Sequence, residues 1–190
     1  MSVPDDLRRE LFEAGDRAWE EFRAHASARH HLFIPSDPGE VYAGLVPLVD
    51  RAHSFLELGS AAGVITILAD LLGFEAYGIE LEPWLVGRSV ELAERFGSGA
   101  TFAEGTFVPE DYQNVIEDLP ADFETPDAGA DAYDELGLEL DEFDLVFNYP
   151  WPGTEDWLQE MMHRHARRDA LLLTFDAKEG LRLDEGPWGH

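Results

Sequence analysis

Residues 54–80 of the chain, SFLELGSAAGVITILADLLGFEAYGIE, decide the expected fold. Apolar runs bounded by small residues predict a strand, a tight turn, a helix, a reversal and a second strand, in that order, at 54–58, 59–63, 64–72, 73 and 75–79. Glu80 follows the second strand. Parallel strands that a helix connects are almost always wound right-handed, so the turn and Glu80 are expected at the same carboxyl edge of a sheet. A nucleoside ligand is expected at that edge.

The spacing within the turn indicates which kind of nucleoside it suits. A G-x-G-x-x-G fingerprint brings a pyrophosphate against bare backbone at a helix N-terminus. Here the spacing is Glu57-x-Gly59-x-x-x-Gly63, and Ala61 holds the middle small position. A carboxylate at Glu57 would repel a pyrophosphate. It suits a ligand that carries an ammonium and a sulfonium, whose own carboxylate the amides of the turn would bind.

At these positions the chain resembles the class I S-adenosylmethionine-dependent methyltransferases. The residues that match or belong to the first motif of that family are Glu57, Gly59, Ser60, Ala61 and Gly63. Glu80, about 20 residues beyond the turn, matches the acid that binds the ribose hydroxyls. The resemblance covers roughly residues 50–176 and is clearest at 54–84 and 142–153. It implies S-adenosylmethionine as the cofactor and a three-layer αβα sandwich with a mainly parallel, Rossmann-like sheet.

The same resemblance assigns the adenine end of the cofactor. Leu81 directly follows the ribose-binding acid and is expected to pack on the adenine ring. A third strand at 100–103 leads into Glu104, Gly105 and Thr106. In the family this strand end binds the adenine amino group, so Glu104 or Thr106 is the expected partner.

The acceptor is expected at the end of a fourth strand, 143–147, which leads into Asn148-Tyr149-Pro150-Trp151. Amino-group methyltransferases have a related tetrapeptide of Asn or Asp, two prolines and an aromatic residue. Because Tyr149 replaces the first proline here, amine specificity stays open. Asn148 and Tyr149 are the predicted catalytic residues, and Trp151 is expected to stack on the substrate. Phe33, in the stretch before the first strand, is a second candidate for the substrate pocket.

Methyl transfer from a sulfonium is an in-line displacement, so proximity and alignment supply much of the acceleration, on the order of 7–11 kcal/mol. An acceptor hydroxyl would also need a base, and no histidine lies in the loops expected to form the site. The sequence therefore favours, weakly, nitrogen or another atom that is nucleophilic without help, in a small or flat acceptor.

The amino-acid composition indicates the surface charge of the protein and the partners that this charge disfavours. The 190 residues include 40 acidic and 13 basic side chains, which gives a net charge of -27, yet 45% of the residues are hydrophobic. A folded chain with a strongly negative surface is expected. Lys178 is the only lysine, and the pattern resembles proteins of salt-accumulating halophiles, where molar salt shortens the screening length to about 3 Å. A nucleic-acid partner is disfavoured on charge.

The absence of cysteine excludes disulfides, thiolate nucleophiles and cysteine-based zinc sites. His30 and His31 are adjacent and lack an acidic companion at ligand spacing, so no metal site is expected. The N-terminus lacks the apolar core of a signal peptide, and no apolar run approaches the roughly 20 residues of a membrane helix. These features predict a cytoplasmic protein without a membrane segment.

We expect one domain over 1–190, with an N-terminal helical cap at 1–49 and a Rossmann-like core at 50–190. An amphipathic helix over 4–26 is interpreted either as a lid over the substrate or as a cover on the sheet. The acidic stretch 110–142 is either a gate or a surface excursion.

The C-terminal part predicts a helix over 155–169 and a fifth strand at 170–175. Residues 178–190 are too few for the two further strands of a full methyltransferase sheet, although 181–183 fits one. The sheet is therefore expected to have five or six strands and to be truncated at its C-terminal end.

Two other functions stay open. A nicotinamide-dependent oxidoreductase would use the same Glu80 for its ribose, although it would be expected to keep the middle glycine of the turn. A noncatalytic S-adenosylmethionine-binding or scaffold protein would keep the fold without turnover. The identity of the acceptor and the oligomeric state are not encoded in any of these patterns.

Overall fold

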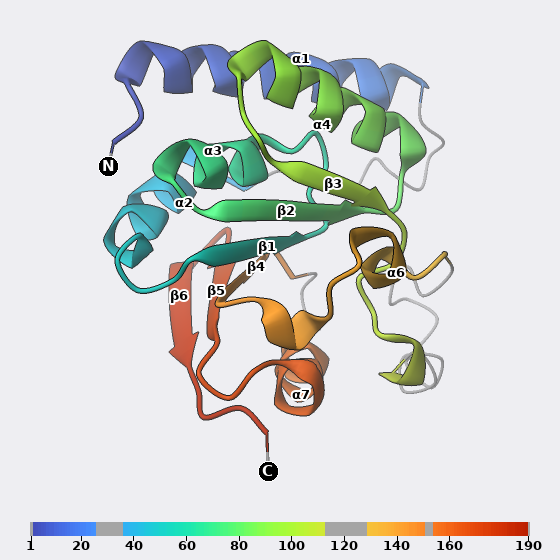
Figure 1. Cartoon of the computed structure of the whole chain (residues 1–190). Helices are drawn as coiled ribbons and strands as arrows, with labels where there is room; N and C mark the ends of the chain where they lie inside the picture. Colours follow the sequence, from blue (N-terminus) through green and yellow to red (C-terminus); the bar gives the residue numbers. More distant parts are fainter. Residues whose placement is uncertain (1, 26–35, 113–128, 151–153, 190) are drawn as a thin grey trace.

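A computed structural model describes residues 2–25, 36–112, 129–150 and 154–189 (Figure 1). Within these residues a six-stranded sheet has the order β3-β2-β1-β4-β5-β6. The strands are β1 (Ser54–Leu58), β2 (Glu75–Glu80), β3 (Thr101–Glu104), β4 (Leu145–Asn148), β5 (Leu171–Asp176) and β6 (Gly180–Glu185). Neighbours from β3 to β5 pair in parallel, and β6 pairs antiparallel with β5. The predicted mainly parallel sheet is confirmed.

Helices cover both faces of this sheet (Figure 1). They are α1 (Asp5–His25), α2 (Pro38–Leu45), the 3₁₀ helix η2 (Val46–Leu48), α3 (Val64–Leu72), α4 (Pro83–Phe96), α6 (Ala132–Leu136), the 3₁₀ helix η3 (Leu140–Glu142) and α7 (Glu155–His165). Because side chains alternate along a strand, Phe55 and Phe147 share a buried cluster with α2, α3 and α4. Leu56 and Val146 share another with α6 and α7. This is the predicted three-layer αβα arrangement.

Local chemistry explains where the helices begin and end. The Asp37 carboxylate caps α2 by accepting hydrogen bonds from the amides of Gly39 and Glu40, at 2.8 and 3.1 Å. Gly73 and Gly97 end α3 and α4 in the left-handed conformation, with φ of 106° and 65°. Helices α2 and α4 begin at Pro38 and Pro83, since proline is favoured in a first helical turn, and α3 and α4 end at glycines.

Helix α1 lies outside the helical layer and has its main contacts with α4 and α3 (Figure 1). Gly15 permits this contact, because a Cβ there would lie 2.3 Å from Cγ2 of Val64. Glycine inside a helix costs roughly 0.5–1 kcal/mol relative to alanine, so its presence fits a need for close approach. The helix expected over 4–26 thus covers other helices and not the sheet itself.

Several element boundaries differ from the expectation. The fourth strand begins at Leu145 and not at Phe143, because η3 and its capping box at Glu139 and Glu142 occupy the preceding residues. Helix α7 ends at His165, four residues before the expected end. The sixth strand is longer than the expected 181–183. No helix in the described ranges combines the length and apolar character needed to cross a membrane.

Candidate functional site

The turn between β1 and α3 is held in a conformation that its small residues permit. Gly59 and Gly63 have φ of 80° and 75°, and Ala61 has φ of 47°, a left-handed value that is uncommon outside glycine. A Cβ on Gly63 would lie 2.7 Å from the Phe102 ring and 2.8 Å from Cβ of Ser89. The glycine at the third small position of the motif, Gly63, is therefore required by packing.

Most amides of the turn already donate to protein oxygens. Those of Gly59 and Ser60 both donate to the carbonyl of Ile79, at 2.9 Å, and that of Gly63 donates to the carbonyl of Ser60 at 2.7 Å. The amide of Ala61 donates to Oε2 of Glu80 at 2.8 Å. These four amides would have to share their hydrogens with a ligand carboxylate, so the predicted carboxylate contact on the turn stays a prediction.

Glu57 and Glu80 project from the same face of the sheet. Glu57 pairs with Gly78, two residues before Glu80, and side chains two apart on a strand share a face. Oε2 of Glu57 accepts from the amide and the hydroxyl of Thr66, at 2.9 and 2.5 Å. Glu80 accepts from Ala61 and, through Oε1, from the amides of the next two residues at 2.9 and 3.1 Å. The two carboxyls thus share a face of the sheet, with Glu80 bonded to the turn at Ala61 and Glu57 bonded to α3 at Thr66.

Burial raises the pKa of both carboxyls. It raises the pKa of Glu57 to about 8, against the hydrogen bonds from Thr66, and the nearby charge of Glu80 adds to the rise. Burial also raises the pKa of Glu80, and its three backbone hydrogen bonds oppose that rise. At neutral pH the Glu57 carboxyl therefore holds its proton in the ligand-free protein.

This raised pKa predicts a pH dependence of stability. Between about pH 4.5 and 8 the unfolded chain has lost the Glu57 proton while the folded chain keeps it, so this group lowers stability as pH rises. Glu57→Gln removes that contribution. Relative to wild type, its free energy of unfolding in urea should rise by about 2–4 kcal/mol between pH 5 and pH 8.5. Glu94→Gln, at an exposed site on α4, is the control. Parallel pH curves for wild type and Glu57→Gln would contradict the prediction.

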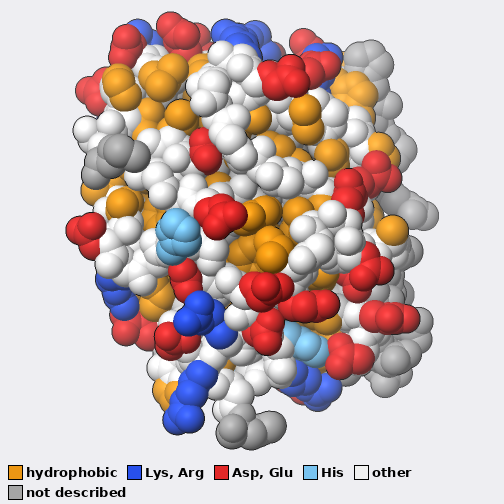
Figure 2. All heavy atoms as spheres, viewed as in Figure 1, with side chains coloured by type: hydrophobic (Ala, Val, Ile, Leu, Met, Phe, Trp, Pro, Cys, Tyr) orange, Lys and Arg blue, Asp and Glu red, His pale blue; other side chains and the backbone are white. Residues whose placement is uncertain are grey.

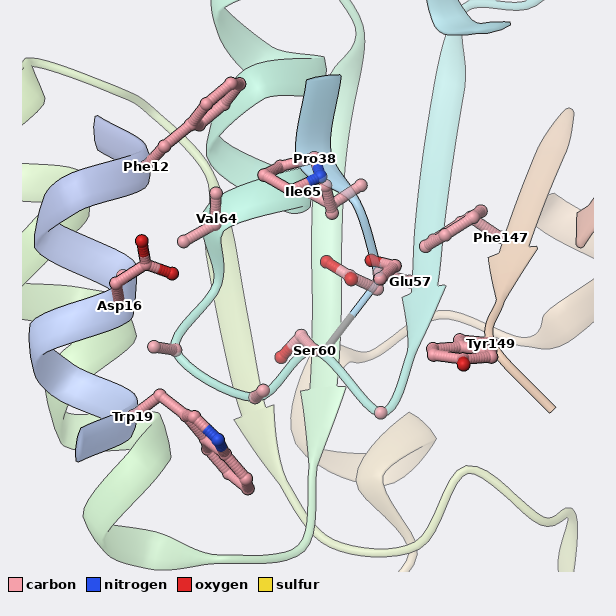
Figure 3. Close-up of a pocket in the computed structure, with 15 residues that line it drawn as sticks. Phe12, Asp16, Trp19, Pro38, Glu57, Ser60, Val64, Ile65, Phe147 and Tyr149 are labelled. Carbon is pink, nitrogen blue, oxygen red and sulfur yellow. The ribbon is translucent and has the colours of Figure 1, made fainter. Parts of the chain in front are cut away.

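A cavity of about 110 Å³ lies beside the turn. In Figure 3 the side chains of α1 stand on one side of it, Phe147 and Tyr149 on the other, and Glu57 and Ser60 between them. Small-molecule pockets usually measure roughly 300–1,000 Å³, so this space fits one end of a nucleoside ligand and not all of it. The described residues lining it are Phe12, Gly15, Asp16, Trp19, Ser36, Pro38, Glu57, Gly59, Ser60, Ala61, Ala62, Val64, Ile65, Phe147 and Tyr149.

The structure divides the predicted cofactor residues into two groups. Those that line the cavity are Glu57, Gly59, Ser60 and Ala61; those that do not are Gly63, Glu80, Leu81, Glu104, Gly105 and Thr106. The second group, apart from Gly63, lies along the ends of β2 and β3, where the amide of Gly105 donates to the carbonyl of Glu80 at 3.0 Å. The bond from Ala61 to Glu80 connects the two groups.

Residues 129–132 pack against the expected adenine side. The amide of Thr106 donates to the carbonyl of Ala130 at 2.9 Å, and a Cβ on Gly129 would lie 2.7 Å from Cδ1 of Leu81. The amide of Glu104 donates to the carboxylate of Glu135 at 2.9 Å. The end of the acidic stretch therefore contacts the candidate site, as a gate or an ordinary connection would.

The predicted catalytic residues point in different directions. Tyr149 lines the cavity and packs edge-on against Phe175, at 5.1 Å between ring centroids. Burial, together with the charge of Asp176, raises the pKa of Tyr149, so its phenol keeps its proton. Asn148 is buried and donates from Nδ2 to the carbonyl of Leu58 at 2.8 Å. It is not among the described lining residues, so its contact with an acceptor stays a prediction.

Two predicted substrate residues are not described by the structure, and one wall of the cavity was not predicted. Phe33 and Trp151, the predicted substrate contacts, lie outside the described residues. The wall from α1, with Phe12, Asp16 and Trp19, was not predicted residue by residue. Gly15 within an amphipathic helix was the available signal for it. Across the described ranges no three His, Asp or Glu side chains gather into a possible metal site.

Neither a protein-family model nor a curated protein sequence matches the chain. Solved structures do. A putative O-methyltransferase from Klebsiella pneumoniae is 18% identical, with a TM-score of 0.54 over 92% of this chain and 66% of its own. An RNA methyltransferase from Salinibacter ruber, in complex with S-adenosyl-L-homocysteine, is 18% identical, with a TM-score of 0.52 over 74% of this chain and 76% of its own.

An O-methyltransferase from Bacillus cereus, in complex with SAH, is 14% identical, with a TM-score of 0.52 over 92% of this chain and 67% of its own. This chain thus spans about two thirds of the length of both O-methyltransferases. Identities at this level establish the fold alone. The chain has the Rossmann-like fold of the class I S-adenosylmethionine-dependent methyltransferases.

Proposed function

We propose that this protein is an S-adenosylmethionine-dependent methyltransferase that acts on a small or flat acceptor, with nitrogen as the favoured acceptor atom. The observation that carries the proposal is a pair of carboxyls, buried Glu57 and half-buried Glu80, on one face of the sheet beside a left-handed turn of small residues. A ligand with an ammonium, a sulfonium and a ribose meets both carboxyls with complementary groups.

The residues present fit this cofactor. Glu57 borders the cavity, where a ligand ammonium would favour its ionised form. The Ser60 hydroxyl, also on the cavity, has no hydrogen-bond partner among the described residues. A carboxylate has about four acceptor sites, and Glu80 uses three for backbone amides, which leaves one for a ribose hydroxyl. Leu81 and the segment from Glu104 to Thr106 are the proposed adenine contacts.

The cofactor would supply a methyl group on a sulfonium, and the chain's own residues would orient the acceptor. Tyr149 is the proposed acceptor contact, because its ring lines the cavity opposite α1. Asn148 ties the end of β4 to β1 through the Leu58 carbonyl and so positions Tyr149. Among the described lining residues there is no histidine, and the phenol of Tyr149 is a poor base. An acceptor that is already nucleophilic suits this site.

Titration with S-adenosylhomocysteine and with NAD tests the proposal. S-adenosylhomocysteine should raise the melting temperature and bind with a Kd in the range of about 1–100 μM by calorimetry, whereas NAD at the same concentrations should do neither. Stabilisation by NAD alone would favour an oxidoreductase and overturn the proposal. Transfer of label from methyl-labelled S-adenosylmethionine to an acceptor then separates an enzyme from a noncatalytic binding protein.

A further inference from the structure

One face of α1 forms a wall of the cavity. Phe12, Asp16 and Trp19 follow one another at helical spacings of four and three residues, so they project from the same side of the helix. All three line the cavity, and Figure 3 shows them on the side away from Tyr149. The contact between Gly15 and Val64 brings this face against the turn. Two aromatic rings and a carboxylate therefore share one wall.

The charges around the cavity have one sign. Its described lining contains the Asp16 carboxylate, the Glu57 carboxyl, which holds its proton until a cation favours its ionised form, and no lysine, arginine or histidine. Within the described residues the Asp16 carboxylate has no ion pair or hydrogen bond; the adjacent Arg17 pairs with Glu13 instead, at 3.9 Å. An anionic ligand would be repelled here, whereas a cation would meet an available carboxylate.

A buried hydroxyl also indicates that the cavity takes a polar ligand. Ser60 is 3% exposed, and its Oγ has no hydrogen-bond partner in the described part of the chain. Leaving a buried polar atom unpaired costs about 1–3 kcal/mol, so a ligand that pairs with it gains that amount. Ser60 lies between Glu57 and the α1 wall in Figure 3.

We propose that the α1 wall selects an acceptor that carries a positive charge, namely a small molecule with an ammonium group attached to an apolar body. The ammonium would contact the Asp16 carboxylate by charge attraction, and the apolar body would pack on the aromatic surface that Trp19 or Phe12 adds to the same wall. A protonated ammonium has no lone pair, so it serves as a handle and the methyl group goes to a second, uncharged atom. The inference rests on the proposed function, because it names the substrate class of that site.

Two probes that share a phenethyl group and carry opposite charges test this selection. Phenethylammonium and 3-phenylpropionate are titrated by calorimetry into protein saturated with S-adenosylhomocysteine, at fixed ionic strength and pH 7. Phenethylammonium should bind at least about tenfold more tightly. Asp16→Asn should remove that preference. Glu20→Gln is the control, because Glu20 is an exposed carboxylate on the same helix outside the described cavity lining, and it should keep the preference.

The outcomes separate this inference from the proposed function. Three results would overturn the inference: equal binding of the two probes, binding of neither, or a preference that survives Asp16→Asn. If S-adenosylhomocysteine binds in the same experiment, the proposed function is still supported. If Asp16→Asn and Glu20→Gln lose the preference for phenethylammonium equally, the preference comes from the overall charge of -27, and the inference is overturned. If S-adenosylhomocysteine itself does not bind, the proposed function fails. The probes are then titrated into cofactor-free protein, and the same criteria decide whether the α1 wall selects a positively charged ligand.

Discussion

Glu80→Gln should weaken the binding of S-adenosylhomocysteine by about a hundredfold or more. The Glu80 carboxylate accepts three backbone hydrogen bonds, from Ala61 on one oxygen and from Leu81 and Glu82 on the other. A glutamine amide has one acceptor oxygen, so its NH₂ group would face a backbone donor and the turn would shift. The ribose contact would be lost as well. A hydrogen bond to a charged group contributes about 1.5–3 kcal/mol, and each 1.4 kcal/mol is tenfold in affinity.

Calorimetric titration of both proteins measures this loss. Glu75→Gln is the matched control, because Glu75 begins the same strand at its exposed opposite end. Its affinity for S-adenosylhomocysteine should stay within about twofold of wild type. Circular dichroism and the melting temperature of each variant establish that it is folded. An unchanged Kd in folded Glu80→Gln would remove Glu80, and with it the proposed ribose site, from the pocket.

Raising KCl from about 0.1 to 3 M at pH 7 should increase the melting temperature by roughly 10 °C or more. With 40 acidic and 13 basic residues, like charges repel one another over the whole surface, and acidic side chains are spread across the face shown in Figure 2. Arginine pairs such as Arg88 with Glu21 and Glu91, at 2.9 and 2.7 Å, are exposed and offset little of this. If salt removes about 4 kcal/mol of this charge repulsion from the folded state, the melting temperature rises by about 8–16 °C.

The same melting series near pH 4.5 is the control, because the sequence pI is about 4.3 and the net charge is small there. The salt effect should then shrink to a small fraction of its value at pH 7. A salt effect of equal size at both pH values would show that salt acts through general burial of apolar surface instead. No effect at pH 7 would contradict the halophile-type interpretation of the composition.

The strand, turn and helix at 54–72 were predicted with the bounds that the structure has, because their causes are local. An apolar run forms the buried strand, and the left-handed turn needs small residues. The need for glycine at position 63 is not visible in the local pattern, because a Cβ there would clash with Phe102 and Ser89, which belong to other elements.

Contacts between segments far apart in the chain decided the features that sequence periodicity did not predict. The alternation along β4 puts Tyr149 on the cavity and turns Asn148 to the carbonyl of Leu58, although the two are neighbours in the chain. The wall from α1 depends on a helix about 40 residues away from the turn docking through Gly15. The packing of 129–132 on Leu81 and Thr106 is also a contact between distant segments.

The sequence by itself determined the order of the elements, the bounds of the turn with its flanking strand and helix, and the sign of the surface charge, because each depends on near neighbours or on composition. Only the tertiary structure decided which turn amides are already bonded, how far burial raises the pKa of Glu57, and that Asp16 and Trp19 face the cavity. These properties arise from groups far apart in the chain, and no local pattern encodes the distance at which such groups meet.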